Sequence, residues 1–153
     1  MTILIVDDDE GEHDVLKRVC QQALPGKTLE FKTAADEQTA RQLLAMEQFD
    51  LILMDMQLTK FPGTEGEALT RLAREQSSLN QNAMIIGGSM DPYCGDSFIS
   101  AGADIFVCKD QGKKNSYDVL RDEIIKLVQQ RTVVEGIDVI NNSSMIGKSQ
   151  AQP

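Results

Sequence analysis

The segment Ile3-Leu4-Ile5-Val6-Asp7-Asp8-Asp9 is a short apolar run followed by acids, which is typical of a buried strand with charged residues at its end. The run Leu51-Ile52-Leu53-Met54 ends in the same way, at Asp55. A third apolar run, 105–108, ends in Lys109. If these strands are parallel neighbours, their charged ends meet at the edge where open α/β sheets bind ligands.

Strands and helices alternate five times along the chain, which predicts an α/β fold. We expect a doubly wound, flavodoxin-like sheet of five parallel strands in the order 2-1-3-4-5, with its switch point beside the first strand. The expected strands are 2–6, 29–33, 51–55, 84–87 and 105–108, and the expected helices are one that Pro25-Gly26 ends, 36–46, one through 68–73, a loose one in 90–103 and 116–131.

The length of 153 residues, of which 41% are hydrophobic, favours one domain with a tail. We expect the domain to span 1–131 and a polar linker or tail to span 132–153. The net charge of −9 argues against direct binding to nucleic acid. The chain shows no apolar run approaching the length of a membrane span and no signal peptide at its start, so we expect a cytoplasmic location and no membrane contact.

Three carboxylates at one sheet edge predict a metal site. Side by side, Asp7, Asp8 and Asp55 would repel one another by about 1 to 4 kcal/mol per pair at intermediate dielectric. Mg²⁺ fits best, because it prefers one or two carboxylates together with waters and a phosphate oxygen. Mg²⁺ and Lys109 together would neutralise the three acids.

The cysteines and the single histidine predict no chemistry of their own. Cys20, Cys94 and Cys108 are odd in number and lack metal-type spacing, so we expect reduced structural thiols. His13 is expected to be a surface side chain on the first helix. A single histidine also excludes a metal site built from several histidines.

Together these residues resemble the receiver domain of two-component response regulators. The resemblance covers about 1–131 and depends on Asp7-Asp8 after the first strand, Asp55 ending the third, Ser89 after the fourth and Lys109 ending the fifth. It implies a phosphorylation-dependent signalling switch, not an enzyme, whose partner is a sensor histidine kinase or a phosphotransfer protein. It also implies dimerisation through the fourth helix, fifth strand and fifth helix.

The resemblance implies a role at each position of the metal and acceptor site. Asp55 would accept the phosphoryl group from a phosphohistidine. Asp8 and the backbone carbonyl of Gln57 would coordinate Mg²⁺ directly, and Asp7 would hold the ion through water.

Three further residues would read the phosphoryl group. Lys109 would pair with the phosphate, and Ser89 would donate a hydrogen bond to it and pull the following loop inward. Phe106 would be the switch aromatic, buried in one state and exposed in the other.

Three departures from the family pattern stand out. The family has a proline after this lysine, joined to it by a cis peptide bond, but here Lys109 is followed by Asp110. A cis peptide bond before a non-proline residue would cost about 3 kcal/mol. The proline expected four positions after the acceptor is absent, and Pro62 comes later. The fourth strand ends Gly87-Gly88-Ser89, so either Gly88 or Ser89 could hold the hydroxyl position.

Two alternatives stay open. A phosphatase of the haloacid dehalogenase type would use Asp7 as nucleophile and Asp9 as acid, but would leave Asp55 unexplained. A pseudo-receiver would keep the fold and act without phosphate.

The segment 144–149 resembles the start of the AAA+ domain in nitrogen-regulation-class activators, so the chain could also be the N-terminal receiver of such a protein.

Overall fold

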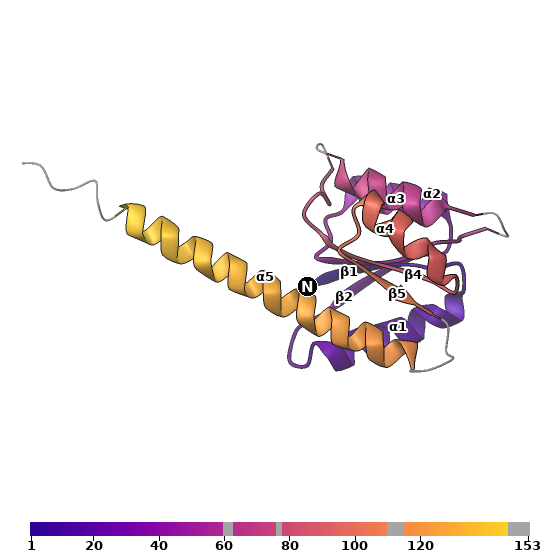
Figure 1. The fold of residues 1–153 in the computed structure, drawn as a ribbon, viewed down its shortest axis with the longest axis horizontal. Coiled ribbons are helices and arrows are strands. Elements are labelled where there is room, and N and C mark those ends of the chain that lie inside the picture. Colours follow the sequence, from indigo (N-terminus) through magenta and orange to yellow (C-terminus); the bar gives the residue numbers. More distant parts are fainter. Residues whose placement is uncertain (60–62, 76–77, 110–114, 147–153) are drawn as a thin grey trace, which may run out of the picture.

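Five parallel strands form one sheet in the order β2-β1-β3-β4-β5 (Figure 1). The computed structural model describes residues 1–59, 63–75, 78–109 and 115–146, with side chains as far as 136. The elements are β1 (Thr2–Val6), α1 (Glu10–Ala23), β2 (Glu30–Ala34), α2 (Glu37–Met46), β3 (Leu51–Asp55), α3 (Glu65–Arg74), β4 (Met84–Ser89), the 3₁₀ helix η1 (Pro92–Cys94), α4 (Gly95–Ala101), β5 (Ile105–Cys108) and α5 (Ser116–Ile146). The predicted fold class and strand order are confirmed.

Helices cover both faces of the sheet. Helices α1 and α5 lie on one face, and α2, α3 and α4 lie on the other (Figure 1). Along β1 the side chains alternate, so that Ile3 and Ile5 pack in the cluster with α1 and α5 while Leu4 and Val6 pack in the other. Each face therefore has its own apolar core, as a doubly wound sheet requires.

Strand register brings the charged strand ends to one edge. Val6 of β1 is paired with Met54 of β3, so the residues that follow them, Asp7 and Asp55, leave the sheet at the same level. On the other side of β3, Asp55 is paired with Gly88 of β4.

The fourth helix is shorter than the sequence predicts. Instead of a loose helix over 90–103, the chain makes the 3₁₀ turn η1 and then the seven-residue α4. Pro92 favours the start of a turn, and Gly102, with φ of 107°, ends α4 in the left-handed conformation.

The last helix is much longer than predicted, and this is a correction. We expected it to end near Arg131 and a polar tail to follow, but α5 continues to Ile146 and leaves the body of the molecule (Figure 1). Its apolar contacts with the sheet extend only as far as Val128. Beyond that point the helix propagates from a nucleated segment, because each added residue needs no new nucleus and no proline interrupts it.

Several expectations fall outside the described residues. They concern Pro62, the isomer of the Lys109-Asp110 peptide and the segment 144–149 from Gly147 onward. Among the residues that the structure describes, no helix combines the length and apolar character that crossing a membrane needs.

Candidate functional site

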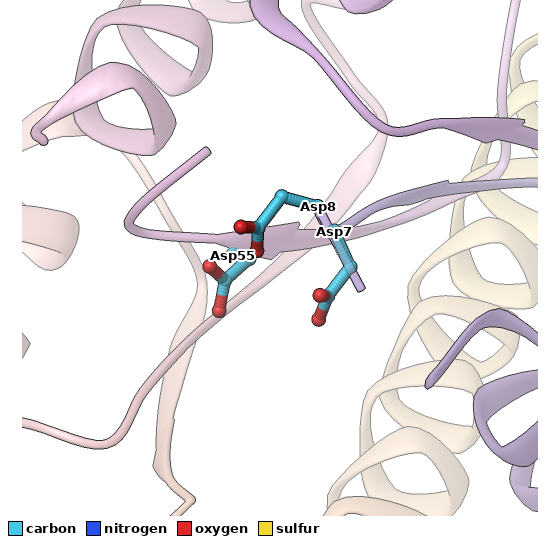
Figure 2. A group of neighbouring side chains, drawn as sticks. All are labelled: Asp7, Asp8 and Asp55. Carbon is cyan, nitrogen blue, oxygen red and sulfur yellow. The ribbon is translucent and has the colours of Figure 1, made fainter. Parts of the chain in front are cut away.

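Three aspartates converge at the carboxyl edge of the sheet (Figure 2). Asp7 and Asp8 follow β1, and Asp55 ends β3. Each offers one carboxylate oxygen, and these oxygens all lie within 4.8 Å of one another. Oxygen ligands so close together fit a hard divalent cation such as Mg²⁺. The structure therefore brings together the three acids that the sequence singles out.

Lys109 joins this cluster from the end of β5. Its Nζ lies 2.7 Å from Asp7 Oδ2 and 2.5 Å from Asp55 Oδ1. The Asp7 side chain is only 4% exposed and the Asp55 side chain 12%. One ammonium thus bridges two nearly buried carboxylates, and charge-assisted hydrogen bonds of this kind are strong.

The electrostatics of Asp55 favour a cation beside it. Burial raises the pKa of Asp55 above its ordinary value, while the attraction of Lys109 lowers it and the charge of Asp7 raises it again. Burial alone would lower the pKa of Lys109, but attraction to Asp55 and Asp7 outweighs it, so that pKa is raised. Lys109 therefore stays charged at neutral pH, and one ammonium does not fully compensate the buried negative charge.

The chain after β3 is fixed close to the acceptor candidate. The backbone N–H of Gln57 donates to Asp55 Oδ2 at 3.1 Å, a turn typical of aspartate. Gln57 thus lies next to the acids, and the metal-binding role that the resemblance implies for its carbonyl stays a prediction.

Gly66 packs against the backbone of Asp55, a contact that the sequence did not predict. A Cβ atom at Gly66 would lie only 1.9 Å from the Asp55 carbonyl oxygen, and the Gly66 N–H donates to Met56 O at 3.0 Å. Glycine at this position lets the start of α3 contact the end of β3. The sequence carries no signal for this, because the contact depends on how α3 packs.

His13 contradicts the expectation of a surface side chain. It is buried, and its Nε2 lies 2.7 Å from the carbonyl oxygen of Asp7, to which the neutral or charged ring donates. The position continues the apolar stripe of α1 through Leu16 and Cys20 at helical spacing, and this periodicity was the available signal. His13 therefore supports the backbone of the β1 end.

Helices α1 and α5 are linked beside the acids by a pair that the sequence did not predict. The Tyr117 hydroxyl donates to the Glu12 carboxylate at 2.8 and 2.9 Å. Burial and then this bond raise the pKa of Tyr117 to about 12, so the hydroxyl keeps its proton. Both residues line a cavity of about 500 Å³ that the aspartates and Lys109 also border.

The fourth strand presents Gly88, not Ser89, to Asp55. Gly88 is paired with Asp55, whereas Ser89 is paired with Cys108. The Ser89 hydroxyl accepts the N–H of Asp91 at 3.1 Å. Of the two positions that the sequence left open for the hydroxyl, strand register favours Gly88.

Phe106 lies on the face of the sheet opposite to the acids. It stacks on Phe98 of α4 with ring centroids 5.9 Å apart, and it is partly buried against that core. A Cβ at Gly95 would be 3.0 Å from its ring. Phe106 thus lies against the start of α4. If it acts as a switch, a change in its position would act on α4.

The comparisons agree with this geometry. The family model described as response regulator receiver domain matches residues 3–121. A CheY-like receiver domain protein from Methanospirillum hungatei is 26% identical with a TM-score of 0.63, over 86% of this chain and 96% of that one. No curated protein sequence matches.

Two further solved structures contain magnesium. The Thermotoga maritima response regulator TrrA, solved in complex with Mg²⁺-BeF, is 25% identical with a TM-score of 0.63, over 82% of this chain and 97% of that one. The receiver domain of a Pseudomonas aeruginosa sensor histidine kinase, solved with magnesium in its active site cleft, is 21% identical with a TM-score of 0.60, over 84% and 94%.

Proposed function

The chain belongs to the response regulator receiver family and is a phosphorylation-dependent signalling switch, and from this premise we propose that Asp55 accepts the phosphoryl group. The observation that supports this choice is the position of its carboxylate. One oxygen lies 2.5 Å from Lys109 Nζ, and an oxygen of Asp55 lies within 4.8 Å of oxygens from Asp7 and Asp8. Asp7 shares both contacts, but its side chain is only 4% exposed against 12% for Asp55, so Asp55 is the more accessible of the two acids that contact the ammonium.

Mg²⁺ is the cofactor of this proposal. The fit depends on the donor set, since three carboxylates supply the oxygen ligands that Mg²⁺ prefers. Asp8, Asp55 and the carbonyl of Gln57 would hold it directly, and Asp7 would hold it through water. When bound, Mg²⁺ would neutralise charge on the transferring phosphoryl oxygens.

The residues of this chain supply the nucleophile and its orientation. A carboxylate oxygen of Asp55 forms the bond to phosphorus as the bond to the donor histidine nitrogen breaks, and the electron pair of that bond leaves with the nitrogen. Lys109, already in contact with Asp55, would pair with the transferred group. His13 holds the backbone of Asp7, so the acid pair keeps its place during transfer.

The partners are part of the same proposal. The donor is a sensor histidine kinase or a phosphotransfer protein, and the chain acts as an acceptor and not as a turnover enzyme. A homodimer would use α4, β5 and α5, and the half-exposed Ile99 on α4 supports a contact there. The net charge of −9 supports a chain that does not bind nucleic acid directly. The cytoplasmic location and the link to an AAA+ activator stay predictions.

The test is phosphorylation by acetyl phosphate with Mg²⁺, measured by intact mass. We expect one phosphoryl group on the wild type and none on Asp55→Asn. Asp14→Asn is the matched control, because Asp14 is an exposed carboxylate on α1 that pairs with Lys17, and it should be labelled like the wild type. Asp8→Asn should raise the Mg²⁺ concentration needed by about tenfold or more.

Other outcomes separate the alternatives. A phosphoryl group on Asp55→Asn as well as on the wild type would mean that another residue is the acceptor. Label on Asp7 with steady turnover of small phosphoesters would indicate the phosphatase. A chain that takes no label and binds neither Mg²⁺ nor beryllofluoride would be a pseudo-receiver.

A further inference from the structure

At the β4 position that is paired with Asp55, the chain has Gly88, which carries no side chain. We propose that Gly88 leaves a phosphoryl group on Asp55 without a hydrogen-bond donor from a β4 side chain, so that Lys109 on β5 responds to phosphorylation while the β4–α4 connection, residues 90–94, does not. This inference rests on the proposed function, because it assumes Asp55 as acceptor.

Strand register and the alternation of side chains place position 88 on the same face of the sheet as Asp55. Asp55 lies on the same face of β3 as Leu53, which packs with α1 and α5. On β4, Gly88 is paired with Asp55, and so any side chain at position 88 would face the same way. It is the one β4 position from which a side chain could reach a group on Asp55.

Both neighbours of Gly88 face the other side. A Cβ at Gly87 would lie 2.5 Å from the Phe98 ring, on the face covered by α4. Ser89 shares that face by alternation. Its hydroxyl accepts the Asp91 N–H at 3.1 Å. Ser89 lines the cavity that Asp55 borders, but its hydroxyl is held by the Asp91 N–H and would have to leave that bond to turn toward Asp55.

The lack of a side chain at Gly88 also leaves room for the side chain of Lys109. A Cβ at Gly88 would lie 3.1 Å from Lys109 Cε and 3.8 Å from Val107 O. The lysine chain therefore passes over bare backbone on its way to Asp7 and Asp55. Because the close neighbour is a flexible side chain, a small residue at position 88 can be accommodated by a shift of a few tenths of an ångström.

Lys109 is then the side chain that would respond to the negative charge of a phosphoryl group on Asp55. Its ammonium contacts both acids, and its backbone N–H donates to Ser89 O at 2.7 Å, so β5 is tied to β4 at this point. A phosphoryl group on Asp55 would compete with Asp7 for the ammonium. The response would begin on β5, not on the connection after β4.

The experiment uses Mg²⁺ and beryllofluoride as the phosphoryl mimic. Bound fluoride is followed by ¹⁹F NMR, and amide hydrogen exchange is followed over residues 90–94. The variants are Gly88→Ser, which adds a hydroxyl, Gly88→Ala, which adds only the methyl group, and Ser89→Ala. The wild type should bind beryllofluoride without slowing exchange over 90–94, and Ser89→Ala should behave in the same way.

Gly88→Ser should slow exchange over 90–94 on binding by about tenfold, the change expected for one added hydrogen bond, and Gly88→Ala should not. Slowed exchange in the wild type that Ser89→Ala abolishes would make Ser89 the donor and overturn the inference, and this comparison holds even if Gly88→Ser does not fold. Slowed exchange in Gly88→Ala equal to that in Gly88→Ser would overturn it too. If no variant binds the mimic, the proposed function fails first and the inference falls with it.

Discussion

Single glycines decide how closely backbone can approach the acids. Gly66 brings the first turn of α3 against the carbonyl of Asp55, and Gly88 lets the Lys109 chain cross β4. In both places the absence of a Cβ atom sets the position of a charged group. A substitution here acts on the site even though no functional atom is removed.

Gly66→Ala should lower the free energy of unfolding by about 2 kcal/mol or more. Alanine is the better helix former by about 1 kcal/mol, but its Cβ would lie 1.9 Å from a backbone oxygen that cannot rotate away, and overpacking of this kind costs about 1 to 3 kcal/mol or more. Urea denaturation measures the change. Gly136→Ala is the matched control, because among the described residues nothing outside its own stretch of helix lies within 4 Å of its Cβ position, and its stability should not fall. Equal effects at both positions would contradict the packing argument.

Cys20 should be inert to thiol reagents across the neutral and moderately alkaline range. The side chain is fully buried, and burial raises its pKa to about 12. Because only the thiolate reacts, a raised pKa keeps the group protonated until the pH approaches that value. Titration with an aromatic disulfide between pH 7 and 9 should modify at most the two partly exposed thiols, Cys94 and Cys108. Cys20→Ala should leave the native count unchanged, and unfolding the wild type should release one more equivalent.

Helix α3 is tied to the opposite edge of the sheet by one arginine. The Arg74 guanidinium donates to the carbonyl oxygens of Gly102, Gln81 and Ala83 at 2.7, 2.9 and 2.6 Å. It also pairs with Asp104 at 2.9 Å. Four partners from two segments, 81–83 before β4 and 102–104 before β5, make this a clasp that joins α3 to the starts of both strands.

Arg74→Ala should lower the free energy of unfolding by about 2 to 3 kcal/mol. The substitution leaves several partly buried carbonyl groups without their donor, and hydrogen bonds to charged groups are worth about 1.5 to 3 kcal/mol. Arg71→Ala provides the comparison within the same helix. Arg71 is 55% exposed and pairs only with Glu67 at i,i+4, so its loss should change stability by about 0.5 kcal/mol or less. If the two variants lose the same stability in thermal and urea unfolding, the four Arg74 contacts stabilise the fold no more than one exposed ion pair, and the prediction is wrong.

The whole molecule consists of a two-faced α/β body and a helix that extends beyond it (Figure 1). The body holds both apolar clusters, and Val128 is the last residue that packs against either one. Val133 and Val134 on the extension are more than half exposed. The stability of the body therefore depends little on the distal part of α5.

A chain ending at Gly136 should keep the unfolding temperature of the full chain within about 2 °C, because no core residue is removed. Its helical circular dichroism should fall, since 137–146 are helical in the structure. Thermal unfolding followed at 222 nm measures both quantities. A large drop in Tm would show that the distal helix stabilises the body, and an unchanged helical signal would show that 137–146 are not helical in solution.

The amino-acid pattern was enough to predict the sheet, its strand order and the residues at its carboxyl edge. Apolar runs that end in charged residues identify buried strands and their ends, and parallel connectivity then forces Asp7, Asp8, Asp55 and Lys109 together. This part was predictable because it follows from local periodicity and from a short list of allowed topologies.

Which side chains and backbone groups surround these residues became known only from the packed fold. The Tyr117–Glu12 bond joins helices that are distant in sequence. The contact of His13 with the Asp7 backbone and the approach of Gly66 to Asp55 join consecutive elements, but both depend on how the helix packs on the sheet. The choice between Gly88 and Ser89 depends on strand register. The length of α5 belongs here as well, because helix propagation depends on a nucleus that the packed body supplies. Local patterns place a residue on an element, but contacts between elements are set by packing.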